Sequence, residues 1–126
     1  MARILLVEDE TGVREFVRRA LTHSGHQVTA VDGGRPALTA LTESEFDLLL
    51  TDIVMPGIDG IDLALHAAEA CEDMAILLMT GYAAERQRAH RVEQLSYRVI
   101  AKPFSLRDIC AAVNETLAKR PARKVA

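Results

Sequence analysis

Short apolar stretches alternate along this chain with longer segments whose apolar residues lie three or four positions apart. The continuous stretches are typical of buried β-strands, and the spaced pattern is typical of helices with one buried face. We expect strands at residues 4–7, 26–31, 48–51, 76–79 and 99–101. We expect helices at residues 11–22, around 37–41, at 61–68, at 83–94 and from Ser105 to about Leu117. The segment 83–94 has little apolar stripe, so its helix is predicted to pack weakly.

Five strand–helix units in regular alternation predict a parallel sheet with helices on both faces. The first, third and fourth strands are apolar at successive positions, which indicates burial on both faces. The second and fifth strands, with Gln27-Val28-Thr29 and Arg98-Val99-Ile100, are mixed in polarity and therefore belong at the edges. The strand order 2-1-3-4-5 meets both conditions, so we expect a doubly wound, flavodoxin-like α/β fold.

Turn and capping residues set several boundaries. Gly25 is expected to end the first helix. Asp59-Gly60 is interpreted as turn chemistry leading into the third helix, not as a metal site. Ser105, followed three residues later by Asp108, predicts a near capping box at the start of the last helix.

Length and charge narrow the class of protein. The chain has 126 residues, of which 49% are apolar and 26% charged, as in one globular domain. Its net charge of −3 would be −7 without four basic residues near the C-terminus, Lys119, Arg120, Arg123 and Lys124. A body this acidic is a poor general nucleic-acid binder, so we expect no nucleic-acid partner. We predict a domain over residues 1–118 and a basic, flexible tail over 119–126.

The sequence has no long apolar segment and no cysteine motif, which bears on the cellular compartment and on the oxidation state of its two cysteines. No apolar run approaches the roughly 18 residues of a membrane span, and residues 4–7 are too short for a signal peptide. We therefore expect a cytoplasmic protein with no membrane association. Cys71 and Cys110 stand apart without a C-x-x-C motif and are predicted to be reduced, packed thiols.

Charged and polar residues stand where the predicted strands end. Ligands of such sheets bind at the carboxyl ends of the central strands. These ends carry three carboxylates, a hydroxyl and an ammonium, which we expect to converge on one crevice: Glu8, Asp9, Asp52, Thr80 and Lys102. Two carboxylates 4 Å apart repel by about 4 kcal/mol at an effective dielectric constant near 20, so a raised carboxyl pKa or a bound cation must offset the charge. Carboxylate oxygens without Cys or His favour Mg²⁺.

An aspartate beside Mg²⁺ and a lysine can attack phosphorus and form an aspartyl phosphate. The cations would neutralise the phosphoryl oxygens, the Thr80 hydroxyl could donate a hydrogen bond to them, and Gly81 leaves space for the entering group.

Several motifs, taken in their order along the chain, resemble the response-regulator receiver domain of two-component signalling, a CheY-like family. They are Glu8-Asp9, Asp52 with Met55-Pro56 and Asp59-Gly60, Thr80-Gly81, and Lys102-Pro103-Phe104. The resemblance covers roughly residues 3–118.

The resemblance implies a role for each matching position. Asp52 would be the phospho-acceptor, and Asp9, Asp52 and the backbone carbonyl of Val54 would ligate Mg²⁺, with Glu8 acting through water. The phosphoryl donor would be a phosphohistidine on a sensor histidine kinase or a phosphotransfer protein.

The resemblance also implies how the phosphoryl group is held. Thr80 and Lys102 would contact its oxygens, and the Lys102–Pro103 bond would be cis, aiming the lysine into the site.

Two departures from the family pattern concern switching and hydrolysis. Val99 stands where receivers usually carry Tyr or Phe, so the switch candidates besides Thr80 and Val99 are Tyr97, on the same strand face, and Tyr82. The alternative is switching through loop ordering.

Val54 and Tyr82, which flank the acceptor, lack an acid or amide to orient water, so we predict slow self-dephosphorylation.

The output that the resemblance implies is a protein contact. No DNA-binding or enzymatic output domain is expected in this chain, and the usual switch surface combines the fourth helix, fifth strand and fifth helix. Its basic residues predict an acidic or mixed partner: Arg86, Arg88, Arg91, Arg98 and Arg107.

The stretches T-D-I-V-M-P and T-G-Y-A-A look most like short regulators of the CpdR type, which act as adaptors in regulated proteolysis. They also resemble receivers of hybrid kinases, so a phosphate shuttle, a sink or a detached hybrid-kinase receiver is the alternative, as a monomer or a phosphorylation-dependent dimer.

Two other classes of protein require residues that this sequence lacks. An aspartyl-phosphate hydrolase of the haloacid-dehalogenase kind needs a second acid two residues after the nucleophile, where Val54 stands. A flavin or dinucleotide carrier needs a glycine-rich loop after the first strand, where Glu8-Asp9-Glu10 would repel a phosphate. We therefore expect self-phosphorylation and self-dephosphorylation only, with no turnover of an external substrate.

Overall fold

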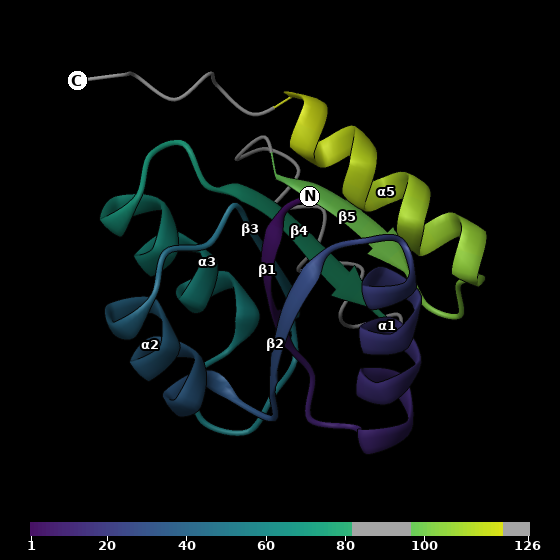
Figure 1. Cartoon of the computed structure of the whole chain (residues 1–126). Coiled ribbons are helices and arrows are strands. Elements are labelled where there is room, and N and C mark those ends of the chain that lie inside the picture. The colour runs from purple at the N-terminus through teal and green to yellow at the C-terminus, as the bar shows by residue number, and fades with distance from the viewer. Residues whose placement is uncertain (82–96, 120–126) are drawn as a thin grey trace.

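The computed structural model describes residues 1–81 and 97–119. All five strands pair in parallel in the order β2-β1-β3-β4-β5, which confirms the predicted topology (Figure 1). The strands are β1 (Arg3–Val7), β2 (Gln27–Val31), β3 (Leu48–Asp52), β4 (Ala75–Thr80) and β5 (Arg98–Ala101). The described helices are α1 (Thr11–His23), α2 (Gly34–Glu43), α3 (Gly60–Ala70) and α5 (Leu106–Lys119). The helix predicted at 83–94 lies outside the described residues.

Burial explains the strand order. Every residue of β3 and β4 is buried, as are the last four of β1, whereas β2 and β5 contain no fully buried residue. The central strands have helices on both faces and need apolar side chains on both. The mixed strands lie at the edges, as the sequence pattern predicted.

Period-two alternation divides the interior into two cores, one on each face of the sheet. Ile4, Leu6, Leu48 and Leu50 point to the core that α1 and α5 cover. Leu5, Val7, Leu49 and other intervening residues point to the core that α2 and α3 cover. Figure 1 shows the two pairs of helices on opposite sides of the sheet. None of the helices within the described ranges is long and apolar enough to cross a membrane.

Two predicted helix starts are confirmed in atomic detail. The Asp59 side chain accepts a hydrogen bond of 2.9 Å from the backbone N–H of Asp62, at the first turn of α3. At α5, Ser105 Oγ accepts from the Asp108 N–H at 3.0 Å, and Asp108 Oδ2 accepts from the Ser105 N–H at 3.1 Å. This reciprocal pair is a capping box with an aspartate in the acidic position.

Candidate functional site

The carboxyl ends of β1, β3 and β5 bring three charged side chains to one face of the sheet. Glu8 follows Val7, which pairs with Thr51, so Glu8 and Asp52 are neighbours across β1 and β3. Both continue the rows of alternate residues that face α1 and α5, and Lys102 continues the row of Ile100. Strand register and alternation are therefore what assemble this site.

Lys102 lies between the two buried carboxylates. Its Nζ is 2.5 Å from Glu8 Oε1 and 3.1 Å from Asp52 Oδ2. Glu8 is fully buried and Asp52 is 4% exposed. The predicted repulsion between the carboxylates is thus offset within the chain by one ammonium, which hydrogen-bonds to both.

Burial and mutual contact shift the pKa values of Glu8 and Lys102. Burial raises the pKa of Glu8 from 4.5 to about 7; the Lys102 hydrogen bond opposes this shift and the Asp52 charge adds to it. Burial alone would lower the pKa of Lys102, but the hydrogen bond to Glu8 and the charge of Asp52 outweigh it, so the pKa is raised. The ammonium therefore stays charged at neutral pH, whereas Glu8 is poised between its two forms.

The carboxylates form a group of a size that suits a cation. One oxygen atom from each of Glu8, Asp9 and Asp52 lies within 4.8 Å of the others. Asp9 is exposed while its two companions are buried, so the group opens to solvent on one side. Three hard carboxylate oxygens match the donors that Mg²⁺ prefers, and the open side leaves room for the waters it retains.

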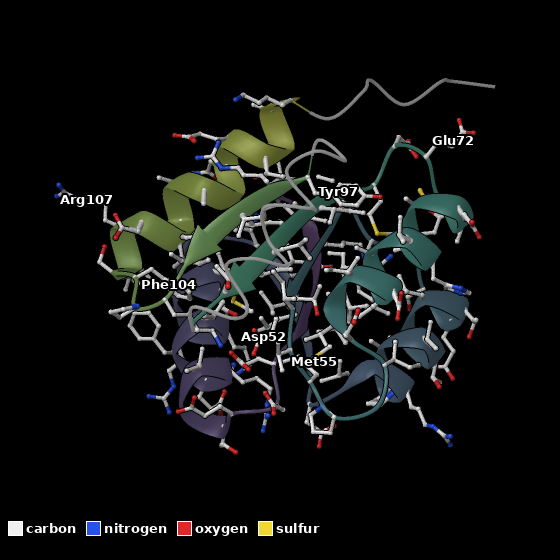
Figure 2. All side chains as sticks on the ribbon, turned by 180° about the vertical axis from the view of Figure 1, so that it is seen from behind. Asp52, Met55, Glu72, Tyr97, Phe104 and Arg107 are labelled. Carbon is white, nitrogen blue, oxygen red and sulfur yellow. The ribbon has the colours of Figure 1, made fainter. Side chains whose placement is uncertain are left out.

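A cleft of about 770 Å³ lies over this group. Its acidic part consists of Glu8, Asp9, Glu10 and Asp52, and Lys102 also lines it. Apolar side chains complete the lining: Val13, Phe16, Val54, Pro103 and Phe104. Figure 2 shows Phe104 and Asp52 at the same end of the sheet. Val54 is predicted from the sequence to lie here, whereas Phe16, whose ring centroid lies 6.5 Å from that of Phe104, is not.

The backbone around Asp52 is closely constrained. The buried Thr51 hydroxyl donates to the Asp52 carbonyl at 3.0 Å, and the Gly60 N–H donates to the Ile53 carbonyl at 2.7 Å. A Cβ on Gly60 would lie 1.9 Å from the Asp52 carbonyl oxygen. Gly60 is therefore required by close packing against β3, a role that the turn interpretation of Asp59-Gly60 did not include.

Thr80, whose hydroxyl is predicted to contact phosphoryl oxygens, is buried at the end of β4. Thr80 is 3% exposed, is not among the residues lining the cleft, and its Oγ1 has no hydrogen-bond partner in the described parts of the chain. The reason is alternation, because Thr80 continues the row of Ile76 and Leu78 on the opposite face from Asp52. Thr80 ends β4 directly before Gly81, which does line the cleft.

The switch candidates occupy different places along the sheet. Tyr97 and Val99 both pack against the core beneath α2 and α3, as the alternation argument expected. Ala101 is the register partner of Thr80, and Tyr97 lies four residues, or about 13 Å, before Ala101, directly before the start of β5. Figure 2 shows Tyr97 at the end of the sheet away from Asp52. Tyr82 lies outside the described residues.

One of the arginines on the expected partner surface, Arg98, is paired within the chain. Arg98 forms an ion pair with Glu115 of α5, so its charge is partly satisfied within the chain. Arg107 is exposed and points away from the body of the molecule (Figure 2). Arg86, Arg88 and Arg91 lie outside the residues that the structure covers.

The Lys102–Pro103 peptide bond is cis. Cys71 and Cys110 are free thiols and both are partly buried. Cys71 Sγ lies 3.0 Å from Asp73 Oδ1, and Cys110 Sγ lies 3.3 Å from Ser24 Oγ. Neither belongs to the carboxylate group at the strand ends.

Known proteins with similar sequences are response regulators. The chain is 43% identical over 117 residues to the response regulator receiver protein CpdR of Brucella abortus, covering 93% of this chain and 98% of that protein. It is 35% identical over 106 residues to the response regulator protein FleR of Pseudomonas aeruginosa, but spans only 22% of that protein's length. Several other regulators that it matches are about twice as long as the matched region.

Solved structures share the fold. A response regulator receiver protein from Sinorhizobium medicae superposes with a TM-score of 0.83 at 30% identity, covering 94% of this chain and 96% of that chain. The response regulator TrrA of Thermotoga maritima, solved in complex with Mg²⁺ and BeF, superposes with a TM-score of 0.80 at 28% identity, covering 92% and 99%. The family description "Response regulator receiver domain" matches residues 4–114. This chain therefore belongs to the response regulator receiver domain family of two-component signalling.

Proposed function

We propose that this protein is a phosphorylation-gated regulator that accepts a phosphoryl group on Asp52. The observation that carries the proposal is the pairing of a nearly buried aspartate with a lysine ammonium 3.1 Å away, beside two further carboxylates. The lysine can neutralise charge on an incoming phosphoryl group, and Asp52 Oδ atoms are the nucleophiles at this end of the cleft.

Asp9, Asp52 and the backbone carbonyl of Val54 are the groups that would hold Mg²⁺, with Glu8 acting through water. Bound Mg²⁺ would neutralise the phosphoryl oxygens and lower the repulsion that the acidic cleft presents to an anion. A regulator related in fold was solved with Mg²⁺ and BeF, which supports this assignment. The domain would span residues 1–118. Of the basic tail expected at 119–126, Lys119 ends α5 and the remaining residues lie outside those that the structure describes.

The transfer step balances with a phosphohistidine donor. An Asp52 oxygen attacks phosphorus, the P–N bond breaks, and its electron pair returns to the imidazole nitrogen, which then takes a proton from solvent. Lys102, whose ammonium donates to Asp52 at 3.1 Å, would hold the transferred oxygens near this residue. The Thr80 hydroxyl at the end of β4 would be a further donor to the same oxygens, which requires this end of β4 to rearrange because Thr80 lies on the other face of the sheet from Asp52.

The receiver family implies a histidine kinase as donor, directly or through a phosphotransfer protein. Similarity to CpdR over nearly its whole length supports a cytoplasmic regulator that acts by binding another protein, with an adaptor role in proteolysis as the specific form. A phosphate shuttle or sink, or a receiver detached from a hybrid kinase, is the second candidate, since the same site chemistry serves both. In neither case would the protein turn over an external substrate.

Beryllofluoride with Mg²⁺ tests the proposal without a kinase. We expect ¹⁹F NMR to show a protein-bound beryllofluoride signal that requires Mg²⁺ and is lost in Asp52→Ala. A pull-down with and without this mimic then distinguishes the two candidates. Binding to a protease or its substrate that changes with the mimic supports the adaptor, and binding to phosphotransfer proteins alone supports the shuttle. Absence of the bound signal in the wild-type protein would contradict the proposal.

A further inference from the structure

Asp9 is exposed, and among the residues that the structure describes none donates a hydrogen bond to its carboxylate. Glu8 and Asp52, its companions in the carboxylate group, are both held by Lys102. The position of Asp9 must therefore be set by the backbone on either side of it.

Arg14 of α1 contacts the backbone on both sides of Asp9. Its Nη1 donates to the Glu8 carbonyl at 2.9 Å, and its backbone N–H donates to the Glu10 carbonyl, also at 2.9 Å. Its Nη2 lies 3.5 Å from Thr11 Oγ1, a weaker contact that steadies the guanidinium at the start of α1. The second bond is the first backbone hydrogen bond of α1, which any residue at position 14 would make, so the guanidinium bond to the Glu8 carbonyl is the contact that depends on arginine.

The other contacts of this loop cannot replace the guanidinium. The Glu8 N–H donates to Val31 at 3.1 Å and continues the sheet, but it lies on the strand side of Asp9. The Glu10 N–H is 3.4 Å from Glu8 Oε2, a long contact to a side chain whose other oxygen holds Lys102. The direction of the Glu8 carbonyl, which sets where the next residue points, therefore depends on Arg14.

We propose that Arg14 is a positioning residue that orients Asp9 for Mg²⁺, an inference that rests on the proposed magnesium site. Arg14 would not touch the ion or the phosphoryl group. Its action through another residue resembles that of outer-shell partners of metal ligands, whose loss commonly weakens metal affinity about 10- to 100-fold.

Electrostatics and positioning predict opposite results when Arg14 is replaced. A positive charge close to three carboxylates repels a divalent cation, so its removal alone would tighten Mg²⁺ binding. If the guanidinium instead orients Asp9, its removal weakens binding despite the gain in electrostatic attraction. The sign of the change therefore separates the two roles.

Isothermal titration of Mg²⁺ into the metal-free full chain measures this sign, using Arg14→Met, Arg14→Lys and the control Arg19→Met. Arg19 is an exposed arginine of the same helix, so its replacement removes one charge without disturbing the Asp9 loop. We expect Arg14→Met to weaken Mg²⁺ affinity about tenfold, Arg14→Lys to recover most of it, and Arg19→Met to leave it unchanged or slightly tighter.

Affinity in Arg14→Met equal to or tighter than in Arg19→Met would overturn the inference while leaving the magnesium site intact. Failure of the wild-type protein itself to bind Mg²⁺ would instead overturn the proposed function, and the inference with it. Thermal unfolding in EDTA establishes that each variant is folded. If Arg14→Met is unfolded, Arg14→Gln takes its place, and unfolding of both would assign Arg14 to stability and overturn the positioning role.

Discussion

The Lys102 ammonium lies 2.5 Å from the fully buried Glu8 carboxylate and, in the same position, 3.1 Å from Asp52. One side chain directly after β5 therefore holds together a carboxylate directly after β1 and a carboxylate at the end of β3. In the metal-free protein Lys102 therefore neutralises both buried carboxylates, and it is also the group that we propose to hold phosphoryl oxygens.

Replacing Lys102 with Met should leave two buried acids without their cation. We expect the free energy of unfolding in EDTA to fall by about 3 kcal/mol, because an unpaired buried charge costs more than the pair contributes. Mg²⁺ should restore part of the loss, since it supplies the missing positive charge. The measurement is urea unfolding, with the exposed Lys119→Met as control, which should change stability by less than about 0.5 kcal/mol. Equal effects of the two substitutions would contradict the structural role of Lys102.

Glu8 should make the stability of the metal-free protein depend on pH. Its pKa is about 7 in the folded protein and 4.5 as the reference value. Between these values the unfolded chain has released the proton and the folded chain still binds it, so stability falls as pH rises from about 4.5 to about 7. Lys102, whose pKa is raised from 10.5, does not titrate in this window.

The Glu8→Gln variant isolates this contribution, because it removes the titrating group and keeps the shape of the side chain. We expect the difference in unfolding free energy between wild type and variant to change over pH 4.5–7, by at most about 3 kcal/mol. Parallel curves for the two proteins across this range would show that the pKa of Glu8 is close to its ordinary value.

Gly60 should tolerate no side chain. An added Cβ would lie 1.9 Å from the Asp52 carbonyl oxygen and 2.9 Å from Ile53 Cα, so the loop after β3 must move. We expect Gly60→Ala to destabilise the protein by at least about 2 kcal/mol in chemical unfolding and to weaken Mg²⁺ binding. Gly12→Ala is the matched control, because nothing lies within 4 Å of its Cβ position in α1, and it should be neutral or slightly stabilising.

The phosphorylated form should be long-lived. Val54 is 40% exposed, lines the cleft and has no polar group to orient an attacking water. We expect Val54→Asn to shorten the half-life of the aspartyl phosphate several-fold, because a carboxamide can hold a water near phosphorus. Decay followed by intact mass measures both proteins. A half-life of seconds in the wild-type protein would rule this account out.

The position of Tyr97 argues against its ring as the switch that responds to Thr80. Tyr97 is about 13 Å along the strand from the partner of Thr80, which is too far for direct contact between the two side chains. We therefore expect Tyr97→Ala to leave phosphorylation-dependent partner binding largely intact. If both Tyr97→Ala and Tyr82→Ala retain that dependence, switching runs through loop ordering instead. Loss of the dependence in Tyr97→Ala alone would show that its ring transmits the change at a distance.

Much of the site was predictable because strand ends are readable from apolar runs. Once β1, β3 and β5 are placed, the rule for doubly wound sheets brings Glu8, Asp52 and Lys102 together without further information. The face on which Thr80 lies was also predictable, because counting alternate residues from Ile76 and Leu78 assigns it to the face opposite Asp52, and its contact with phosphoryl oxygens stays a prediction.

Other features were not predictable, because they depend on side-chain conformations and on loop paths. The bond from Arg14 to the Glu8 carbonyl and the ion pair of Arg98 with Glu115 join residues that no periodic pattern relates. The direct contact of Glu8 with Lys102 likewise depends on how far the lysine extends into the sheet end. The close approach of Gly60 to β3 appears only when the loop path is known.

The most direct test of the central claim is to incubate the protein with acetyl phosphate and Mg²⁺ and to map the product by mass spectrometry. We predict one added phosphoryl group, located on Asp52, absent in EDTA and absent from the Asp52→Asn variant. An unmodified wild-type protein under conditions that phosphorylate another receiver, or a phosphoryl group found on a different residue, would contradict the account.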